Sequence, residues 1–404
     1  MSDLAGRFRE LWDGIAPVGR DADSGGYLRY ALTAPELRLR EWFRAQADHR
    51  GMPVSEDGNG NLFAWWGDPT TGDQTGTGAV LTGSHFDSVP HGGAYDGPLG
   101  IVSAFLAVDE LRAAGATPVR PVVVAAFVEE EGARFGVPCL GSRLLTGEID
   151  ADRAAGLRDA AGVSFAEALG DRPAGADPTL LGRFAAFVEL HVEQGRALVD
   201  ADAPVAVASA IWPHGRWRFE LRGEGNHAGT TRMADRRDPM LTYAFTVLAA
   251  NKEARLRGAH ATVGRVAVEP NATNAIPSKV TGWLDARAAE PETLHDLVEA
   301  VQAKAAERAR RDGTALTVTP ESTTPLVAFD GGLAGRLAAL LAAPVLPTGA
   351  GHDAGVLAAH LPTAMLFVRN PTGVSHSPAE SATDDDCAAG VVALARVLEE
   401  LACH

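Results

Sequence analysis

The stretch PVVVAAFVEEEGARF, residues 121–135, carries an apolar run directly into three consecutive glutamates. A short run this rich in valine predicts a strand that is buried on both faces of a sheet. Adjacent carboxylates repel one another and lose hydration when buried, so Glu129, Glu130 and Glu131 either lie in water or surround a cation. Taken alone, the pattern fits a solvated loop as well as it fits a functional site.

Bulk composition bounds the classes of protein that the chain can be. The 404 residues are enough for two domains, or for one large domain with an insertion. The net charge of −16 argues against nucleic acid or an anionic membrane as a partner, because phosphates need a basic face. No window approaches about 18 uninterrupted apolar residues, so we expect no membrane span. Three cysteines without a CxxC spacing, Cys139, Cys387 and Cys403, are typical of a reduced, cytoplasmic protein.

Short apolar runs recur along the chain with longer amphipathic segments between them. This alternation predicts an α/β sheet that is covered by helices on both faces. In such folds ligands collect at the carboxyl ends of the strands, and here His85, the glutamates and His191 follow three of the runs. The runs are AVLTGSHFD (79–87), PVVVAAFVEEE (121–131), FAAFVELHVEQG (184–195) and TAMLFVRN (363–370).

The pattern changes at about residue 211. WRFELRG alternates like a strand, a helix follows in DPMLTYAFTVLAANKEARLRG, and two more strands follow in ATVGRVAVEP and PSKVTGWLDAR. Pro291 and Gly313 bound a second helix before a last strand in TALTVTP. This order is that of a ferredoxin-like (βαββαβ) domain. We therefore predict a domain inserted at 211–322 into a catalytic domain made of residues 1–210 and 323–404, with an exposed loop at 70–78.

Four further residues give the glutamates a context. Imidazole and carboxylate are ligands that Zn²⁺, Mn²⁺ and Co²⁺ accept. Each of the four follows an apolar run or sits in a glycine turn, where its side chain can face a cleft: His85, Asp96, His191 and His376. Asp87 could accept the second N–H of the His85 imidazole. A lone histidine at a strand end is more often an ordinary hydrogen-bonded residue, and Asp96 also suits a plain turn, so it is the combination that predicts a metal site.

Eight motifs, in order, resemble the M20-type metal-dependent amidohydrolases, in the branch of the allantoate amidohydrolases and N-carbamoyl-L-amino acid hydrolases. They span roughly residues 60–385 and are GSHFDSV, AYDGPLG, EEEGARFG, HVEQG, NHAGTT, NATNAIPSKV, GAGHDAG and VSHSPAE. The resemblance implies a zinc-peptidase-like mixed-sheet catalytic domain, with the inserted domain as a lid through which the chain forms a homodimer. It also implies two divalent metal ions per subunit, zinc or manganese, with cobalt and nickel as further options.

The resemblance assigns the base and the ligands residue by residue. Glu130 matches the general acid/base of the family, and Glu129 is left as a solvated neighbour. His191 stands where the related peptidases carry a carboxylate, which favours the carbamoylase branch. The implied ligands are Asp96, which would bridge the two ions, His85 and His191 on one ion, and Glu131 and His376 on the other.

Four residues of the inserted domain match positions of the family that contact substrate. Arg287 offers a bidentate fork for a carboxylate and Asn274 can hydrogen-bond the same group, although residues of these types at strand ends and turns are commonly plain surface residues. His227 matches a histidine that steadies the developing oxyanion, in related enzymes from the partner subunit. His214 stands where the family carries a glutamine that contacts substrate, which alters the distal end of the pocket.

The sequence therefore predicts a two-metal amidohydrolase that acts on a small carboxylate substrate, with Glu130 as general acid/base. The predicted reaction is cleavage of the carbamoyl or ureido C–N bond of allantoate or of an N-carbamoyl-L-amino acid. Two alternatives stay open: hydrolysis of an N-formyl or N-acyl amino acid at the same site, and a non-catalytic metal-binding relative. His352 and Asp353 fit the family pattern in GAGHDAG, but no role for them follows from the sequence.

Overall fold

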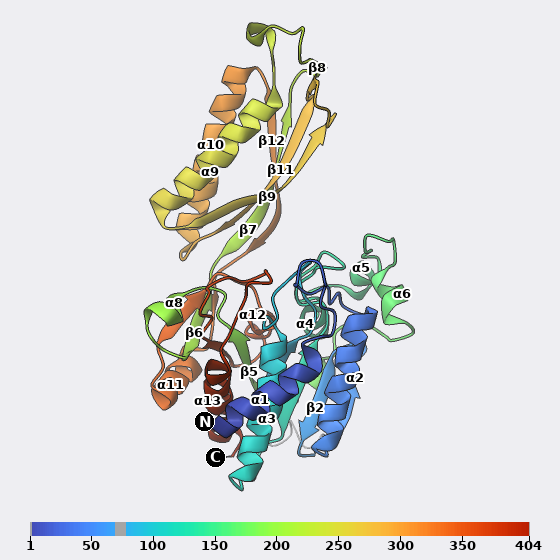
Figure 1. Cartoon of the computed structure of the whole chain (residues 1–404), viewed down its shortest axis with the longest axis vertical. Coiled ribbons are helices and arrows are strands. Elements are labelled where there is room, and N and C mark those ends of the chain that lie inside the picture. Colours follow the sequence, from blue (N-terminus) through green and yellow to red (C-terminus); the bar gives the residue numbers. More distant parts are fainter. Residues whose placement is uncertain (1, 69–77, 404) are drawn as a thin grey trace. The chain divides into compact units, whose positions relative to one another are not determined.

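The computed structural model describes residues 2–68 and 78–403, and the chain forms two compact units (Figure 1). The first unit comprises Met1–Ser209 and Ala328–His404, and the second comprises Ala210–Val327. The loop predicted at 70–78 lies outside the described residues, apart from Gly78. Among the helices that are described, none is both long and apolar enough to pass through a bilayer.

A mixed sheet organises the first unit. In the described part of the chain its strand order is β1-β2-β4-β3-β5-β15-β6-β13, with β14 paired to β6. The central strands β4, β3, β5 and β15 are parallel, whereas β2 and β6 run antiparallel to their neighbours, which confirms the predicted mixed α/β architecture. The strands are β1 (Val54–Glu56), β2 (Leu62–Trp66), β3 (Ala79–His85), β4 (Val122–Phe127), β5 (Phe184–Val192), β6 (Val205–Ile211), β13 (Val327–Ala328), β14 (Val345–Thr348) and β15 (Thr363–Val368).

Burial on both faces explains why the central strands read as apolar runs. Every residue of β3, β4 and β15 is buried. Alternate side chains of these strands and of β5 pack with α1, α3 and α13 into one core. On the opposite face of the sheet, the rings of Phe127 in β4 and Phe187 in β5 pack edge to face. The helices are α1 (Ser2–Ile15), α2 (Ala34–His49), α3 (Pro98–Ala113), α4 (Leu140–Thr146), α5 (Ala151–Ala155), α6 (Phe165–Leu169), α7 (Pro178–Leu181), α8 (Ala197–Asp200), α11 (Gly331–Leu341), α12 (Asp353–Leu357) and α13 (Asp384–Ala402).

The second unit is a four-stranded antiparallel sheet with two helices on one face (Figure 1). Its order is β12-β7-β11-β9. Strand β8, which comes after β7 in the chain, pairs with β10, which comes before β11, to form a separate two-stranded ribbon. The predicted bounds of the second helix are confirmed, since Pro291 begins α10 and Gly313 caps it with φ of 68°. The elements are β7 (His214–Arg222), β8 (Asn226–His227), a 3₁₀ turn (Met233–Asp235), α9 (Pro239–Arg257), β9 (His260–Glu269), β10 (Ala275–Ile276), β11 (Lys279–Arg287), α10 (Pro291–Asp312) and β12 (Ala315–Thr324).

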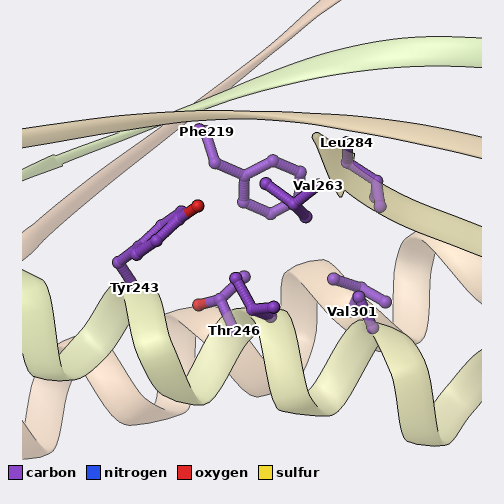
Figure 2. A pocket seen from close by; sticks show the side chains of 9 residues that line it. Phe219, Tyr243, Thr246, Val263, Leu284 and Val301 are labelled. Carbon is purple, nitrogen blue, oxygen red and sulfur yellow. The ribbon is translucent and has the colours of Figure 1, made fainter. Parts of the chain in front are cut away.

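Apolar side chains fill the space between this sheet and its helices. Figure 2 shows a small pocket there, where Phe219, Val263 and Leu284 from the sheet face Tyr243 and Val301 from the helices. The pocket exposes no polar surface, so it is part of the packing of the unit and offers nothing to orient a polar ligand.

Candidate metal centre

Six of the predicted site residues converge at the carboxyl ends of the parallel strands. His85 is the last residue of β3, and His191 lies one residue before the end of β5. Because β3 is parallel to both β4 and β5, their carboxyl ends meet at one edge of the sheet. The remaining four lie in the loops after β4 and β15 and before α3: Glu130, Glu131, His376 and Asp96.

One group of ligand atoms surrounds Oδ1 of Asp96. The Nε2 atoms of His85 and His191 lie 3.5 Å and 3.2 Å from this oxygen. Each imidazole donates from Nδ1 to a backbone carbonyl, that of Asp87 at 3.0 Å and that of Val192 at 2.9 Å. A carbonyl can only accept, so in the neutral rings Nε2 carries the lone pair. Both Nε2 atoms are buried without a hydrogen-bond partner, which is the state expected of metal-binding imidazoles.

A second group surrounds the other oxygen of the same carboxylate. The Nε2 atom of His376 lies 3.4 Å from Asp96 Oδ2 and 3.5 Å from Glu131 Oε2. Burial and the nearby Asp96 charge raise the pKa of Glu131 to about 7. The side chain of His376 is 50% exposed, whereas those of Asp96 and Glu131 are almost fully buried. The structure therefore brings together all five predicted ligands, with Asp96 facing both groups.

The spacing of these atoms fits divalent ions. Two ligands of a tetrahedral zinc ion, each about 2.1 Å from the metal, lie about 3.4 Å apart. The four distances from a histidine Nε2 to a carboxylate oxygen in these groups range from 3.2 Å to 3.5 Å, and all ligand atoms of each group lie within 4.8 Å of one another. Nitrogen and carboxylate oxygen are also the donors that zinc and manganese accept. The residues present thus fit two ions that share the Asp96 carboxylate.

Glu130 lies beside the first group without belonging to either group. Its Oε2 is 3.6 Å from His85 Nε2, and its Oε1 accepts a hydrogen bond from the thiol of Cys139 at 3.5 Å. Burial raises the pKa of Glu130 well above its usual range. A carboxyl group with a raised pKa next to a metal site is able both to accept and to release a proton near neutral pH.

Two neighbouring carboxylates extend this arrangement. Asp87 lies beside His85 Nδ1 as predicted, with its Oδ1 at 3.5 Å, although its backbone carbonyl is closer at 3.0 Å; its carboxylate also accepts the N–H groups of Glu130 and Glu131 at 3.1 Å and 3.0 Å. Glu129 is not solvated: it is fully buried, and its Oε1 accepts the N–H groups of Arg134 and Phe135. The backbone at Glu129 is left-handed, with φ of 55°, and its side chain contacts its own loop. Burial and the Asp87 charge raise the pKa of Glu129 to about 8.

Two polar residues of the site were missed from sequence. Gln194 donates from Nε2 to Asp96 Oδ2 at 2.8 Å, and Glu380 accepts the N–H groups of Tyr95 and Asp96 at 2.8 Å and 2.9 Å. Both lie inside motifs that contain a predicted ligand, HVEQG and VSHSPAE. Their nearness to a ligand in the sequence was the signal from which they could have been predicted. His352 and Asp353, for which no role was predicted, are buried beside the site, and the His352 ring centre lies 4.5 Å from that of His191.

The other four predicted site residues lie in the second unit and form two pairs. His214 and Arg287 are register partners across β7 and β11, and Arg287 donates from Nε to Asp285 at 2.8 Å. His227 lies in β8 of the ribbon and Asn274 directly precedes β10, and Ala228 N–H donates to the Asn274 carbonyl at 3.0 Å. β7 begins at His214, and the ribbon lies beyond its other end (Figure 1). At about 3.3 Å per residue, this nine-residue strand spans about 26 Å.

Known proteins resemble the chain over nearly its whole length. Residues 81–400 match peptidase family M20/M25/M40. The N-carbamoyl-L-amino acid amidohydrolase of Geobacillus stearothermophilus is 37% identical over 411 residues, which cover 97% of this chain and 98% of that protein. The allantoate amidohydrolase of Escherichia coli (strain K12) is 33% identical, with 94% of each covered. The crystal structure of an amidase of the hydantoinase/carbamoylase family from Burkholderia vietnamiensis superposes with a TM-score of 0.86 at 29% identity, covering 98% of each chain.

The family match includes every predicted residue of the site. The matched range runs from β3 to α13 and so contains both ligand groups and both pairs of the second unit. The chain therefore belongs to the M20 family of metal-dependent amidohydrolases, in the branch of the allantoate amidohydrolases and N-carbamoyl-L-amino acid amidohydrolases.

Proposed function

We propose that this enzyme hydrolyses the carbamoyl or ureido C–N bond of a small carboxylate substrate, allantoate or an N-carbamoyl-L-amino acid. The observation that carries the proposal is the pair of ligand groups joined through Asp96, with the Glu130 carboxylate beside the first of them. The names of the two relatives, which act on these two substrates, support the substrate class.

The residues of the site divide the work of hydrolysis. Two divalent ions, when held by the two ligand groups, would acidify a water molecule and polarise the substrate carbonyl. Glu130 takes a proton from the attacking water and delivers it to the leaving nitrogen as the C–N bond breaks. The carbamoyl carbon leaves as carbamate, which decomposes to carbon dioxide and ammonia. The raised pKa of Glu130 suits a group that must hold this proton between the two transfers.

A substrate panel with metal removal tests this proposal. Protein loaded with Mn²⁺ or Zn²⁺ is expected to consume allantoate or an N-carbamoyl-L-amino acid and to release ammonia in step, and to lose all activity when stripped of metal. Substrate loss without ammonia, confined to N-formyl or N-acyl amino acids, would replace the proposed substrate class. Turnover that survives complete stripping would rule out the metal mechanism, and no turnover by metal-loaded protein would favour a binding relative.

We further propose that residues 211–322 form a ferredoxin-like lid that also joins two subunits. The sheet order β12-β7-β11-β9 supports the ferredoxin-like topology. The two pairs of candidate substrate residues support the dimer. A substrate the size of an amino acid cannot span about 26 Å, so Arg287 and His227 of one chain cannot both contact it. A complete site would take one pair from each of two subunits.

An apolar stripe on α9 is the surface that a second copy of the chain would cover. Leu241, Phe245, Leu248 and Leu256 recur at helical spacing, and Leu248 and Leu256 are 71% and 69% exposed. The adjacent strand β9 is an edge of the sheet, because it pairs only with β11 among the described strands. Exposed apolar side chains next to an open strand edge favour association, and a symmetric dimer would bury both.

Mixing two inactive variants should restore activity if the site is shared. Arg287→Met and His227→Ala each damage every site of their own homodimer. In a mixed dimer one site receives both damaged groups and the other receives neither, so a refolded equimolar mixture should show about one quarter of wild-type activity. The measurement is ammonia release by the mixture and by each variant alone.

Two leucine variants control this experiment. Leu248→Glu, placed in both chains, should abolish the rescue by breaking the dimer, whereas Leu37→Glu, at an exposed leucine of α2, should leave it intact. Light scattering should show a mass of one 42.2 kDa chain for the first variant and of two for the second. A mixture that stays inactive while it remains dimeric would mean that each subunit builds its own site.

We also propose a cytoplasmic location. Cys139, Cys387 and Cys403 are free thiols, which is usual for proteins of a reducing compartment. The acidic net charge gives nucleic acid no basic face to bind, so a small anionic substrate is the expected partner.

A further inference from the structure

Glu380 lies outside both ligand groups, yet its side chain joins the two loops that carry them. It is buried, and its Oε1 accepts the N–H groups of Tyr95 and Asp96 at 2.8 Å and 2.9 Å. Its Oε2 accepts the hydroxyl of Ser375 at 3.1 Å. One carboxylate therefore ties the loop of the shared ligand Asp96 to the loop of His376.

The surroundings of Glu380 leave little room for another arrangement. A Cβ added at Gly93 would lie 2.2 Å from Glu380 Oε1, so the backbone of the Asp96 loop is in close contact with this carboxylate. The hydroxyl of Ser375 also lies 3.3 Å from Asp96 Oδ2, the oxygen that faces His376. Glu380 thus contacts both loops that carry the second ligand group, at Asp96 and at Ser375 next to His376.

His376 needs such support more than the other ligands do. His85 and His191 sit on strands inside the sheet, where neighbouring strands fix their backbone. His376 lies in a loop, its side chain is half exposed, and its φ of 55° is a conformation that a residue with a Cβ rarely adopts. Side-chain contacts with its loop must therefore hold it in place, those of Glu380 and of Gln194, whose Nε2 lies 3.3 Å from His376 Nε2, among them.

We propose that Glu380 is a positioning residue that holds Asp96 Oδ2 and His376 at the spacing required by the second metal ion. The inference rests on the proposed two-metal function. It predicts an unequal effect, because two of the three ligands of the first group, His85 and His191, sit on strands, whereas all three ligands of the second lie in loops. Loss of Glu380 should therefore weaken the second ion much more than the first.

Metal retention tests this role directly. Glu380→Ala should hold one of its two ions about 10- to 100-fold more weakly than the wild type, measured as metal content against graded chelator. Glu380→Gln should bind the same ion with an affinity within about 10-fold of the wild type, because its amide oxygen still accepts both N–H groups. At a chelator concentration that removes the weakened ion from Glu380→Ala, adding His376→Ala should cost no further ion, whereas adding His85→Ala should leave none.

A matched control separates positioning from general stability. Asp150 also accepts two consecutive N–H groups on one oxygen, those of Asp152 and Arg153, but contacts no ligand, so Asp150→Ala should keep both ions. If Glu380→Ala does not fold, Glu380→Asp, whose shorter side chain draws the carboxylate away from the N–H groups of Tyr95 and Asp96, must still weaken one ion. Equal retention of both ions by the variant that folds would overturn the positioning role alone. Wild-type protein that binds no pair of ions would overturn the proposed function as well.

Discussion

Replacing Glu130 with glutamine is expected to lower kcat by about 10²- to 10⁴-fold while both metal ions stay bound. The amide has nearly the size of the carboxyl group, but it cannot take a proton from water. Metal binding should survive, because Glu130 belongs to neither ligand group and faces the first of them only through its contact with His85. The measurement is steady-state kinetics and metal content on the same sample.

A second buried glutamate serves as the control for this substitution. Glu36 of α2 is buried and accepts the Leu32 N–H, and it has no contact with a ligand. Glu36→Gln should therefore retain wild-type kcat even if it loses some stability. A Glu130→Gln variant with unchanged kcat would show that another group, or none, moves the proton.

Replacing Asp96 with asparagine should remove both ions at once. Each oxygen of this carboxylate faces a different ligand group, so the substitution takes a negative charge from both. Because the ions supply several kcal/mol of transition-state stabilisation, turnover should fall by more than about 10³-fold. Metal content after dialysis is the primary measurement, with kcat as the second.

The contrast with His376→Ala makes the result interpretable. That variant removes a ligand from one group only and should keep the ion bound by His85 and His191. Asp96→Asn protein that still carries two ions would show that Asp96 does not bridge them, and loss of both ions from His376→Ala would show that the groups do not bind independently.

The parts of the fold that position the site could be predicted because their signals are local. The apolar runs of β3, β4 and β5 each end at a candidate ligand or at the glutamates, and parallel pairing then brings those ends together. The second helix of the inserted segment was bounded correctly from Pro291 and Gly313. In each case a few adjacent residues decide the conformation.

The remaining features depend on backbone geometry and on distant contacts. Glu129 is buried and has a left-handed backbone that no neighbouring residue signals. The contact between Glu380 and Asp96 joins residues 284 positions apart, so no spacing pattern could reveal it. By contrast, the separation of Arg287 from Asn274 follows from the strand predicted between them, since β11 runs from Lys279 to Arg287. The sequence was enough to identify the candidate ligands and the base, whereas the contacts that fix their loops appear only in the structure.

The unequal exposure of the ligands has a consequence for metal exchange. His85 and His191 are fully buried, whereas half of the His376 side chain faces solvent. An ion in the second position could leave and re-enter without moving a strand, but one in the first would have to wait for the surrounding loops to open. If the two groups hold ions as proposed, exchange at the second position should therefore be faster than at the first.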